Sequence, residues 1–178
     1  DFALMARASR FGSDSHRHPD QGSFALFFGG KALISPSGYF GRAYGTKHHM
    51  QWLNSTRAHN AILVDGEGQP SRSMLPTGKI LFCKEENGIK TAKLDMSAAY
   101  EKLTCWTRTF TLTEDTLQID DHIEANEPVT ITYPLHTLVL PSVQDNILTV
   151  ERENVTLTVK PAAGELSDCE ISDKFAVD

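Results

Sequence analysis

The stretch Ser15–Tyr39, SHRHPDQGSFALFFGGKALISPSGY, decides the fold that this sequence predicts. Two apolar runs flank the pair Gly29–Gly30, which is the pattern of two strands joined by a tight turn. The polar residues of the stretch come just before the first run. The stretch therefore predicts a β-hairpin that carries its polar chemistry at one end of a rigid sheet.

Period-two alternation of apolar and polar residues continues through the rest of the chain. Asn87–Gly88, between two alternating segments, is the strongest hairpin signal. No window shows the sustained 3.6-residue period of a long helix, and residues 43–56 have room for one helical turn. The short spacing of the strands predicts an all-β fold, an antiparallel β-sandwich, in place of βαβ units. The expected strands are 2–11, 22–28, 31–35, 60–65, 79–86, 89–96, 103–112, 116–124, 128–138, 146–151 and 154–160.

The chain has 178 residues, 40% of them apolar, which is enough to bury one core, so we expect a single domain over residues 1–178. The longest apolar runs, such as Phe24–Phe28, are as short as strands, which argues against a membrane span. The first residue is Asp1, not Met, and a strand-like segment begins at once. We therefore expect the chain to be part of a longer protein.

The three cysteines, Cys83, Cys105 and Cys169, have no zinc-type spacing and form no CxxC pair. Cys83 and Cys105 fall in neighbouring expected strands and could form a disulfide in an oxidising compartment. We favour the alternative, in which they are buried free thiols.

The net charge of −6 hides an asymmetry. Residues 1–60 carry seven Lys and Arg against three acids, whereas the remainder carries ten against twenty. A locally basic region favours an anionic ligand, although chance scatter of surface charge would give the same count. Nucleic-acid binding has no support, because the chain is acidic overall and holds no finger or RNP-like motif.

Five of the seven histidines lie between positions 16 and 59. In an extended segment His16 and His18 would point to the same side, and His59 begins an expected strand that could return to the same end of the sheet. Imidazoles with one carboxylate would suit zinc. The carboxylate stays open among Asp14, Asp20 and Asp65, of which Asp65 is better explained as a turn residue.

Residues 36–58 form a long connection that contains Tyr39, Phe40, Tyr44 and Trp52. Long connections of this kind in a small domain are usually functional. Aromatic rings beside imidazole and basic groups are typical of a sugar-binding cleft, and they would equally serve to hold the loop against its own domain. We favour the cleft.

Other classes of site fit less well. A cupin is also a sandwich with an HxH motif, but the glutamate that should follow is missing, where Gly22 and Ser23 stand. No GxSxG motif is present, and Gly29–Gly30 is explained by a hairpin turn without a phosphate.

The segment HRHPDQGSFALFFGGKALISPSGY, followed by STRAHNAILVDGEGQ, resembles the heparinase II/III-like family of polysaccharide lyases. The shared pattern is H-x-H-x-D-x-G-S-F, a glycine turn, a strand ending in Gly-Tyr, and T-x-x-H-N before a strand. It covers residues 13–70, and residues 100–138 look like later sandwich strands of the family. The resemblance implies an N-terminal α/α toroid and a C-terminal antiparallel, supersandwich-like domain with the active site between them. Such enzymes cleave uronate-containing polysaccharide, heparan-type glycosaminoglycan or alginate, by β-elimination.

The resemblance also implies roles for individual residues. His16 matches a histidine that faces the uronate, and Tyr44 matches a loop tyrosine that assists the elimination, so both are expected to be catalytic. His18 and His59 match the two histidines of a zinc site. The carboxylate of that site stands two residues before Gly-Tyr, where this chain has Pro36, so His48, His49, Asp20 or no metal at all remain the options. The substrate-binding residues that we expect are Arg17, Arg42, His48, His49, Trp52 and Asn60.

The partners implied are an acidic polysaccharide and an N-terminal helical domain that supplies the remaining acid–base groups, so this chain alone is expected to be inactive. We expect a periplasmic or secreted location in preference to the cytoplasm. Two other readings stay open. One is a non-catalytic carbohydrate-binding or accessory sandwich module, which Pro36 favours, and the other is a structural β-domain with surface histidines.

Overall fold

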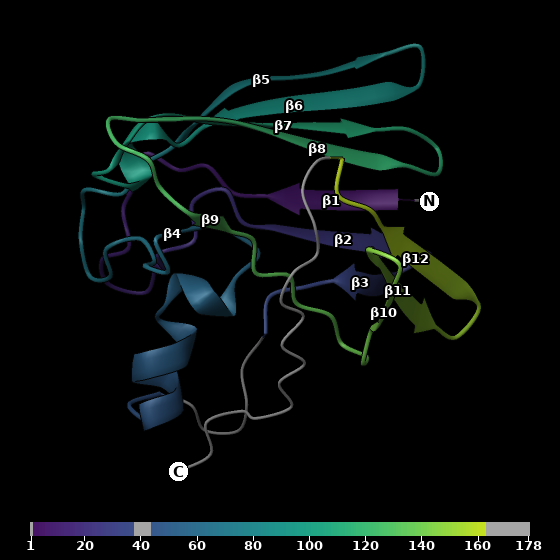
Figure 1. Ribbon diagram of the computed structural model, residues 1–178, viewed down its shortest axis with the longest axis horizontal. Helices are drawn as coiled ribbons and strands as arrows, with labels where there is room; N and C mark the ends of the chain where they lie inside the picture. Colours follow the sequence, from purple (N-terminus) through teal and green to yellow (C-terminus); the bar gives the residue numbers. More distant parts are fainter. Residues whose placement is uncertain (1, 38–43, 163–178) are drawn as a thin grey trace.

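The computed structural model describes residues 2–37 and 44–162, and these form antiparallel sheets with three short helical turns (Figure 1). One sheet has the order β1-β2-β3 and a larger one the order β5-β6-β7-β8, while β4 pairs with β9 and β10-β11-β12 form a second three-stranded sheet. The strands are β1 (Phe2–Ala6), β2 (Phe24–Phe28), β3 (Lys31–Ile34), β4 (Leu63–Val64), β5 (Lys79–Glu86), β6 (Ile89–Asp95), β7 (Leu103–Leu112), β8 (Leu117–Ala125), β9 (Ile131–Thr132), β10 (Ser142–Gln144), β11 (Ile147–Arg152) and β12 (Val155–Val159). The helical turns are η1 (His49–Leu53), η2 (Thr56–Ala58) and η3 (Ser97–Ala99).

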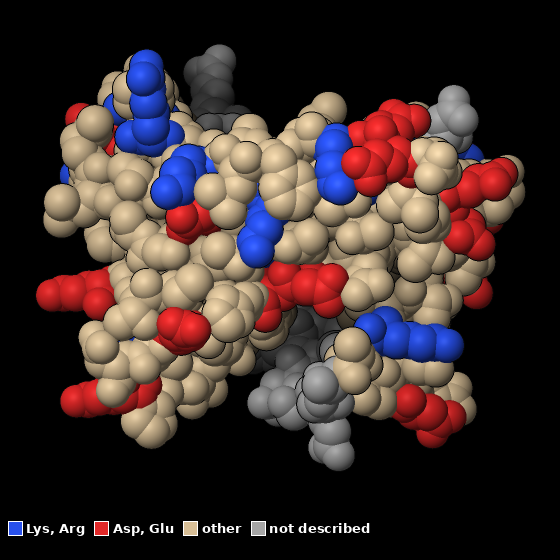
Figure 2. Space-filling view, turned by 90° about the horizontal axis from the view of Figure 1, so that it is seen from above, with Lys and Arg blue, Asp and Glu red and all other residues tan. Residues whose placement is uncertain are grey.

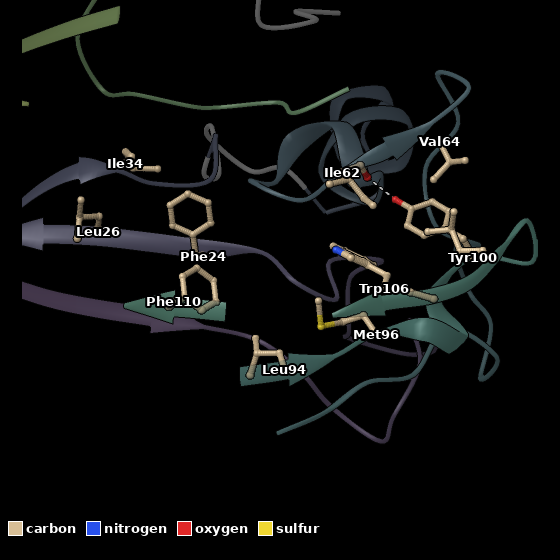
Figure 3. Packing of buried hydrophobic residues seen from close by; sticks show 12 residues of the cluster. Phe24, Leu26, Ile34, Ile62, Val64, Leu94, Met96, Tyr100, Trp106 and Phe110 are labelled. Atoms are coloured by element: carbon tan, nitrogen blue, oxygen red, sulfur yellow. Dashed lines mark hydrogen bonds between the residues drawn. The ribbon is translucent and has the colours of Figure 1, made fainter. Parts of the chain in front are cut away.

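The core lies between the sheet β1-β2-β3 and the sheet β5-β6-β7-β8. Phe24 of β2 meets Phe110 of β7 edge to face, with ring centroids 5.7 Å apart. Trp106 is fully buried, and Tyr100 packs beside it while donating a hydrogen bond to the carbonyl of Ile62 (Figure 3). Each large apolar side chain that is fully buried contributes about 1.5–3 kcal/mol to folding.

A buried ion pair lies within the inward-facing row of β7. Arg108 has the same parity as Trp106 and Phe110 and is 2% exposed. Its Nε and Nη2 donate to the two carboxylate oxygens of Asp121 on β8, at 2.9 and 2.7 Å, and Trp106 Nε1 donates to the same carboxylate at 2.8 Å. Arg108 Nη1 donates to the carbonyl of Gly22 at 2.7 Å, which joins the larger sheet to the segment before β2.

We expect Asp121→Ala to destabilise the protein by about 3–5 kcal/mol, because it leaves a guanidinium buried without its counter-ion. Asp120→Ala is the matched control, since Asp120 is exposed on the same strand and its carboxylate accepts from the Gln118 side chain. That change should cost less than about 0.5 kcal/mol. Urea unfolding of both variants checks the difference, and equal losses would contradict the role given to the ion pair.

The all-β antiparallel prediction is confirmed, and the expected strands 79–86 and 103–112 are found with the same bounds. The segments 2–11, 60–65 and 128–138 were expected to be longer strands than they are, and β10 was not expected. Beyond Ala6 the Gln21 side chain accepts from Ser9 N–H and donates to the carbonyls of Ser9 and Phe11, in place of a neighbouring strand. Pro128 and Pro134 cannot donate to a ladder, and only Ile131–Thr132 between them pair.

Cys83 and Cys105 are free thiols, as favoured from the sequence, and β6 lies between their strands β5 and β7. Cys83 is exposed and Cys105 half-buried, so the expectation that the thiols are buried is wrong for Cys83. Cys169 lies outside the described residues. Over residues 2–37 and 44–162, no helix has the length and apolar character needed to cross a membrane.

Candidate functional site

The loop between β1 and β2 carries the first histidines, and it is not extended. Ser15 has φ 62°, and residues 15–16 form a turn. The expectation that His16 and His18 point to one side by period-two alternation is therefore wrong. His16 is exposed, whereas His18 is half-buried and faces His59.

His18 and His59 are in direct contact although they are 41 residues apart. His18 Nδ1 and His59 Nε2 are 3.0 Å apart, and the two rings meet at 66°. Thr56 in η2 holds the two segments together, because its hydroxyl donates to the carbonyl of Pro19 at 2.7 Å and accepts from Gln69 N–H at 2.8 Å. The fold thus brings the two predicted metal ligands, His18 and His59, into contact.

The surroundings keep both imidazoles neutral near pH 7. Burial lowers the pKa of His59 to about 4, and the neighbouring His18 adds to the effect. Burial, followed by the positive charge of Arg7, also lowers the pKa of His18. Two neutral rings can share one hydrogen bond, in which one N–H donates to the other ring's lone pair.

Among the described residues the donor set does not complete a zinc site. Two imidazole nitrogens converge, but no group of three His, Cys, Asp or Glu side chains gathers around one point. Asp20 is committed to an ion pair with Arg7, whose Nη1 also donates to the carbonyl of His18 at 3.1 Å. Pro36, which replaces the expected acid, lines a shallow groove together with Arg7 and Asp20.

The residues around η1 form a second polar group. Trp52 Nε1 donates to Ser37 Oγ at 2.9 Å, and its ring meets that of His136 edge to face. Tyr44 is 84% exposed and lies against His49, with ring centroids 5.1 Å apart. His48 is buried.

The remaining expected site residues have different surroundings. Asn60 is buried, and its side chain donates to the carbonyl of Phe24 and accepts from His136 N–H, both at 2.8 Å, so its amide is used within the protein. Arg17 is half-buried, and its Nε donates to the carbonyl of Asp14 at 3.1 Å. Arg42 lies outside the described residues.

Sequence reasoning missed Arg7 and His136. Arg7 holds Asp20 and the backbone of His18. His136 donates from Nε2 to the carbonyl of Arg57 at 2.8 Å, and burial lowers its pKa, so it lies next to the Trp52 and Asn60 side chains as a neutral ring. Alternation in the run YPLHT could not have predicted the position of His136, because this segment is not a strand.

Fold and site together define a class: an antiparallel β domain with histidine-bearing loops gathered at one end of its sheets. The family model described as "Heparinase II/III-like, C-terminal" matches residues 1–173. The chain therefore belongs to this family, which confirms the resemblance drawn from the sequence.

Two solved structures with the same fold have names that agree with this family. A heparinase III, the BT4657 gene product, superposes with a TM-score of 0.67 at 19% identity, over 84% of this chain and 23% of its own. The heparan sulfate lyase HepC from Pedobacter heparinus superposes with a TM-score of 0.70 at 17% identity, over 88% of this chain and 25% of its own. The chain thus spans about a quarter of these proteins. No curated protein sequence matches it.

We expect Pro36→Asp to raise the affinity for zinc at least about tenfold, because it returns a carboxylate ligand to the neighbourhood of two convergent imidazoles. Pro36→Asn is the matched control, since it removes the same ring without adding a charge. Competition with a chromogenic chelator measures the dissociation constant for zinc in the full-length protein that contains this chain. Equal affinity in the two variants would show that position 36 does not reach the histidine pair.

Proposed function

We propose that this chain is the β-domain part of a polysaccharide lyase that cleaves uronate-containing polysaccharide, heparan-type glycosaminoglycan or alginate, by β-elimination. The observation that carries the proposal is the family membership over residues 1–173 together with an exposed His16 on a loop that the His18–His59 contact holds in place. The names of the structural relatives, heparinase III and heparan sulfate lyase, support the same reaction class.

β-Elimination on a uronate needs three things. The carboxylate at C5 must be neutralised, a base must remove the C5 proton, and an acid must protonate the leaving glycosidic oxygen. In the proposal His16 contacts the uronate and Tyr44 assists proton transfer, since both side chains are exposed and can reach a ligand. The other acid–base groups come from a helical domain outside this chain, so the chain alone is inactive.

A second candidate is a non-catalytic carbohydrate-binding module. It is favoured by the absence of a carboxylate ligand at the expected position. Pro36 stands where the resemblance expects an acid, and Asp20 forms an ion pair with Arg7. Such a module would bind polyuronate without cleaving it.

The test uses the full-length protein on heparan sulfate and on alginate, following the ultraviolet absorbance of the unsaturated uronate that β-elimination creates. We expect His16→Ala to lower the rate about 10²–10³-fold, the range for loss of one group that stabilises the charge developing in the transition state. His122→Ala is the control, because this exposed histidine lies on β8 and its ring contacts the carboxylate of Glu124. It should leave the rate unchanged.

Two results separate the candidates. Absence of unsaturated product from both polysaccharides, with binding retained, would overturn the lyase and support the binding module. An equal loss in the His16 and His122 variants would remove His16 from the reaction while leaving the lyase in place.

A further inference from the structure

Arg10 and Arg17 of the loop between β1 and β2 lie against one aromatic ring, and Arg72 belongs to the segment that bonds Ser13 of this loop. None of the three has an acidic partner among the described residues. Arg10 and Arg17 both contact the ring of Phe11, with guanidinium carbons 5.0 and 5.2 Å from its centroid. Arg17 Nη2 also lies 3.8 Å from the sulfur of Met74, two residues after Arg72. Over residues 2–37 and 44–162, every ion pair involves other residues.

Hydrogen bonds join the two backbone segments that carry these arginines. Ser13 N–H donates to the carbonyl of Ser73 at 2.6 Å, and the Ser13 hydroxyl donates to the carbonyl of Pro70 at 2.6 Å. A Cβ at Gly12 would stand 2.1 Å from the Ser73 oxygen, so only glycine permits this approach. Both segments lie at the end of the sheets opposite the β5–β6 turn (Figure 1).

The side chains are also restrained. The Phe11 ring, 43% exposed, gives Arg10 and Arg17 a surface on which a planar guanidinium stacks while its in-plane N–H groups stay available. Arg72 has φ 51°, an uncommon conformation for a residue with a side chain, and its Nη2 lies 3.3 Å from the sulfur of Met50. Sulfur and carbonyl partners leave the positive charges uncompensated.

Some basic residues elsewhere on the surface have acidic partners. Over β5 and its surroundings, Lys and Arg are interspersed with Asp and Glu (Figure 2), and Lys79 pairs with Asp95 and Lys84 with Glu86. Like charges held close together destabilise a surface unless an anion joins them. The positive charge of Arg17 also reaches Arg7, whose pKa is lowered by burial and then by Arg17.

We propose that Arg10 and Arg17, which lie over Phe11, together with Arg72 on the adjacent segment form a binding site for the oxyanion groups, sulfate or carboxylate, of an acidic polysaccharide. Guanidinium groups bind such planar or tetrahedral oxyanions through paired N–H donors. Because Arg17 follows the exposed His16, a chain bound at His16 runs onto this site, which then holds a neighbouring sugar unit. The site rests on the proposed function for its ligand class and adds residues to it.

The test measures binding of the full-length protein to three polysaccharides by titration calorimetry: heparan sulfate, its unsulfated form of the same backbone, and alginate. We expect Arg10→Gln, Arg17→Gln and Arg72→Gln combined to weaken binding about tenfold or more at low salt, with a flatter salt dependence. The control combines Lys84→Gln, Lys90→Gln and Lys160→Gln, which removes the same charge from exposed positions elsewhere. Its binding should change less than about twofold.

Phe11→Leu provides a second variant that keeps all three charges. It should weaken binding by an intermediate factor, because the guanidinium groups lose the ring that orients them. Circular dichroism melting of each variant establishes that the fold persists. A loss confined to heparan sulfate identifies sulfate as the ligand group, and a loss on all three polymers identifies the carboxylate.

Unchanged binding in the folded arginine variant, or an equal loss in the lysine control, would overturn the site. These outcomes differ from failure of the lyase proposal. If the protein yields no unsaturated product but the arginine variant loses binding, the site stands and the reaction fails. If the lyase is active and the arginine variant binds normally, the reaction stands and the site fails.

Discussion

The buried pair of Arg108 and Asp121 is the interaction on which the rest of the arrangement depends. A guanidinium inside a core needs acceptors for its N–H groups, and here the acceptors come from different parts of the chain. Asp121 takes the two N–H groups that face β8, and the carbonyl of Gly22 takes the third. A buried ion pair such as this one adds little to the net free energy of folding, and its main effect is to favour one arrangement of the core over others.

Gly22 shows how close that packing is. A Cβ at this position would stand 2.5 Å from the ring of Trp106, and φ is 80°, so any other residue is excluded on two grounds. The Arg108 guanidinium also lies 3.4 Å from the carbonyl of Asn60. The segments that carry His18 and His59 are thus both held against β7 near their histidines, and the 3.0 Å contact between the two rings follows from this.

The sequence predicted the regular parts of the fold because local rules decide them. Asn87–Gly88 adopts φ 52° and 80°, as a two-residue hairpin turn requires, and β7 alternates from Cys105 to Leu112 after a register shift near its start. It also predicted that His18 and His59 meet. Alternation failed where a side chain replaced a strand as hydrogen-bond partner, as Gln21 does, and where Ser15 turned the chain. Arg108 has the same parity as Trp106 and Phe110 in the sequence, but its counter-ion Asp121, directly opposite on β8, could be found only from the register of β7 and β8.

The excess of basic residues in the first sixty positions divides into two kinds once the contacts are known. Arg7 and Lys31 have acids, Asp20 and Glu153, and serve the fold. Arg10 and Arg17 have an aromatic ring and backbone or sulfur atoms. Shortage of acids cannot explain this, because the chain holds 23 Asp and Glu against 17 Lys and Arg. Arg10 and Arg17 thus keep their positive charge available at one small surface, and the oxyanion ligand proposed above would supply the negative charge that the described residues do not place there.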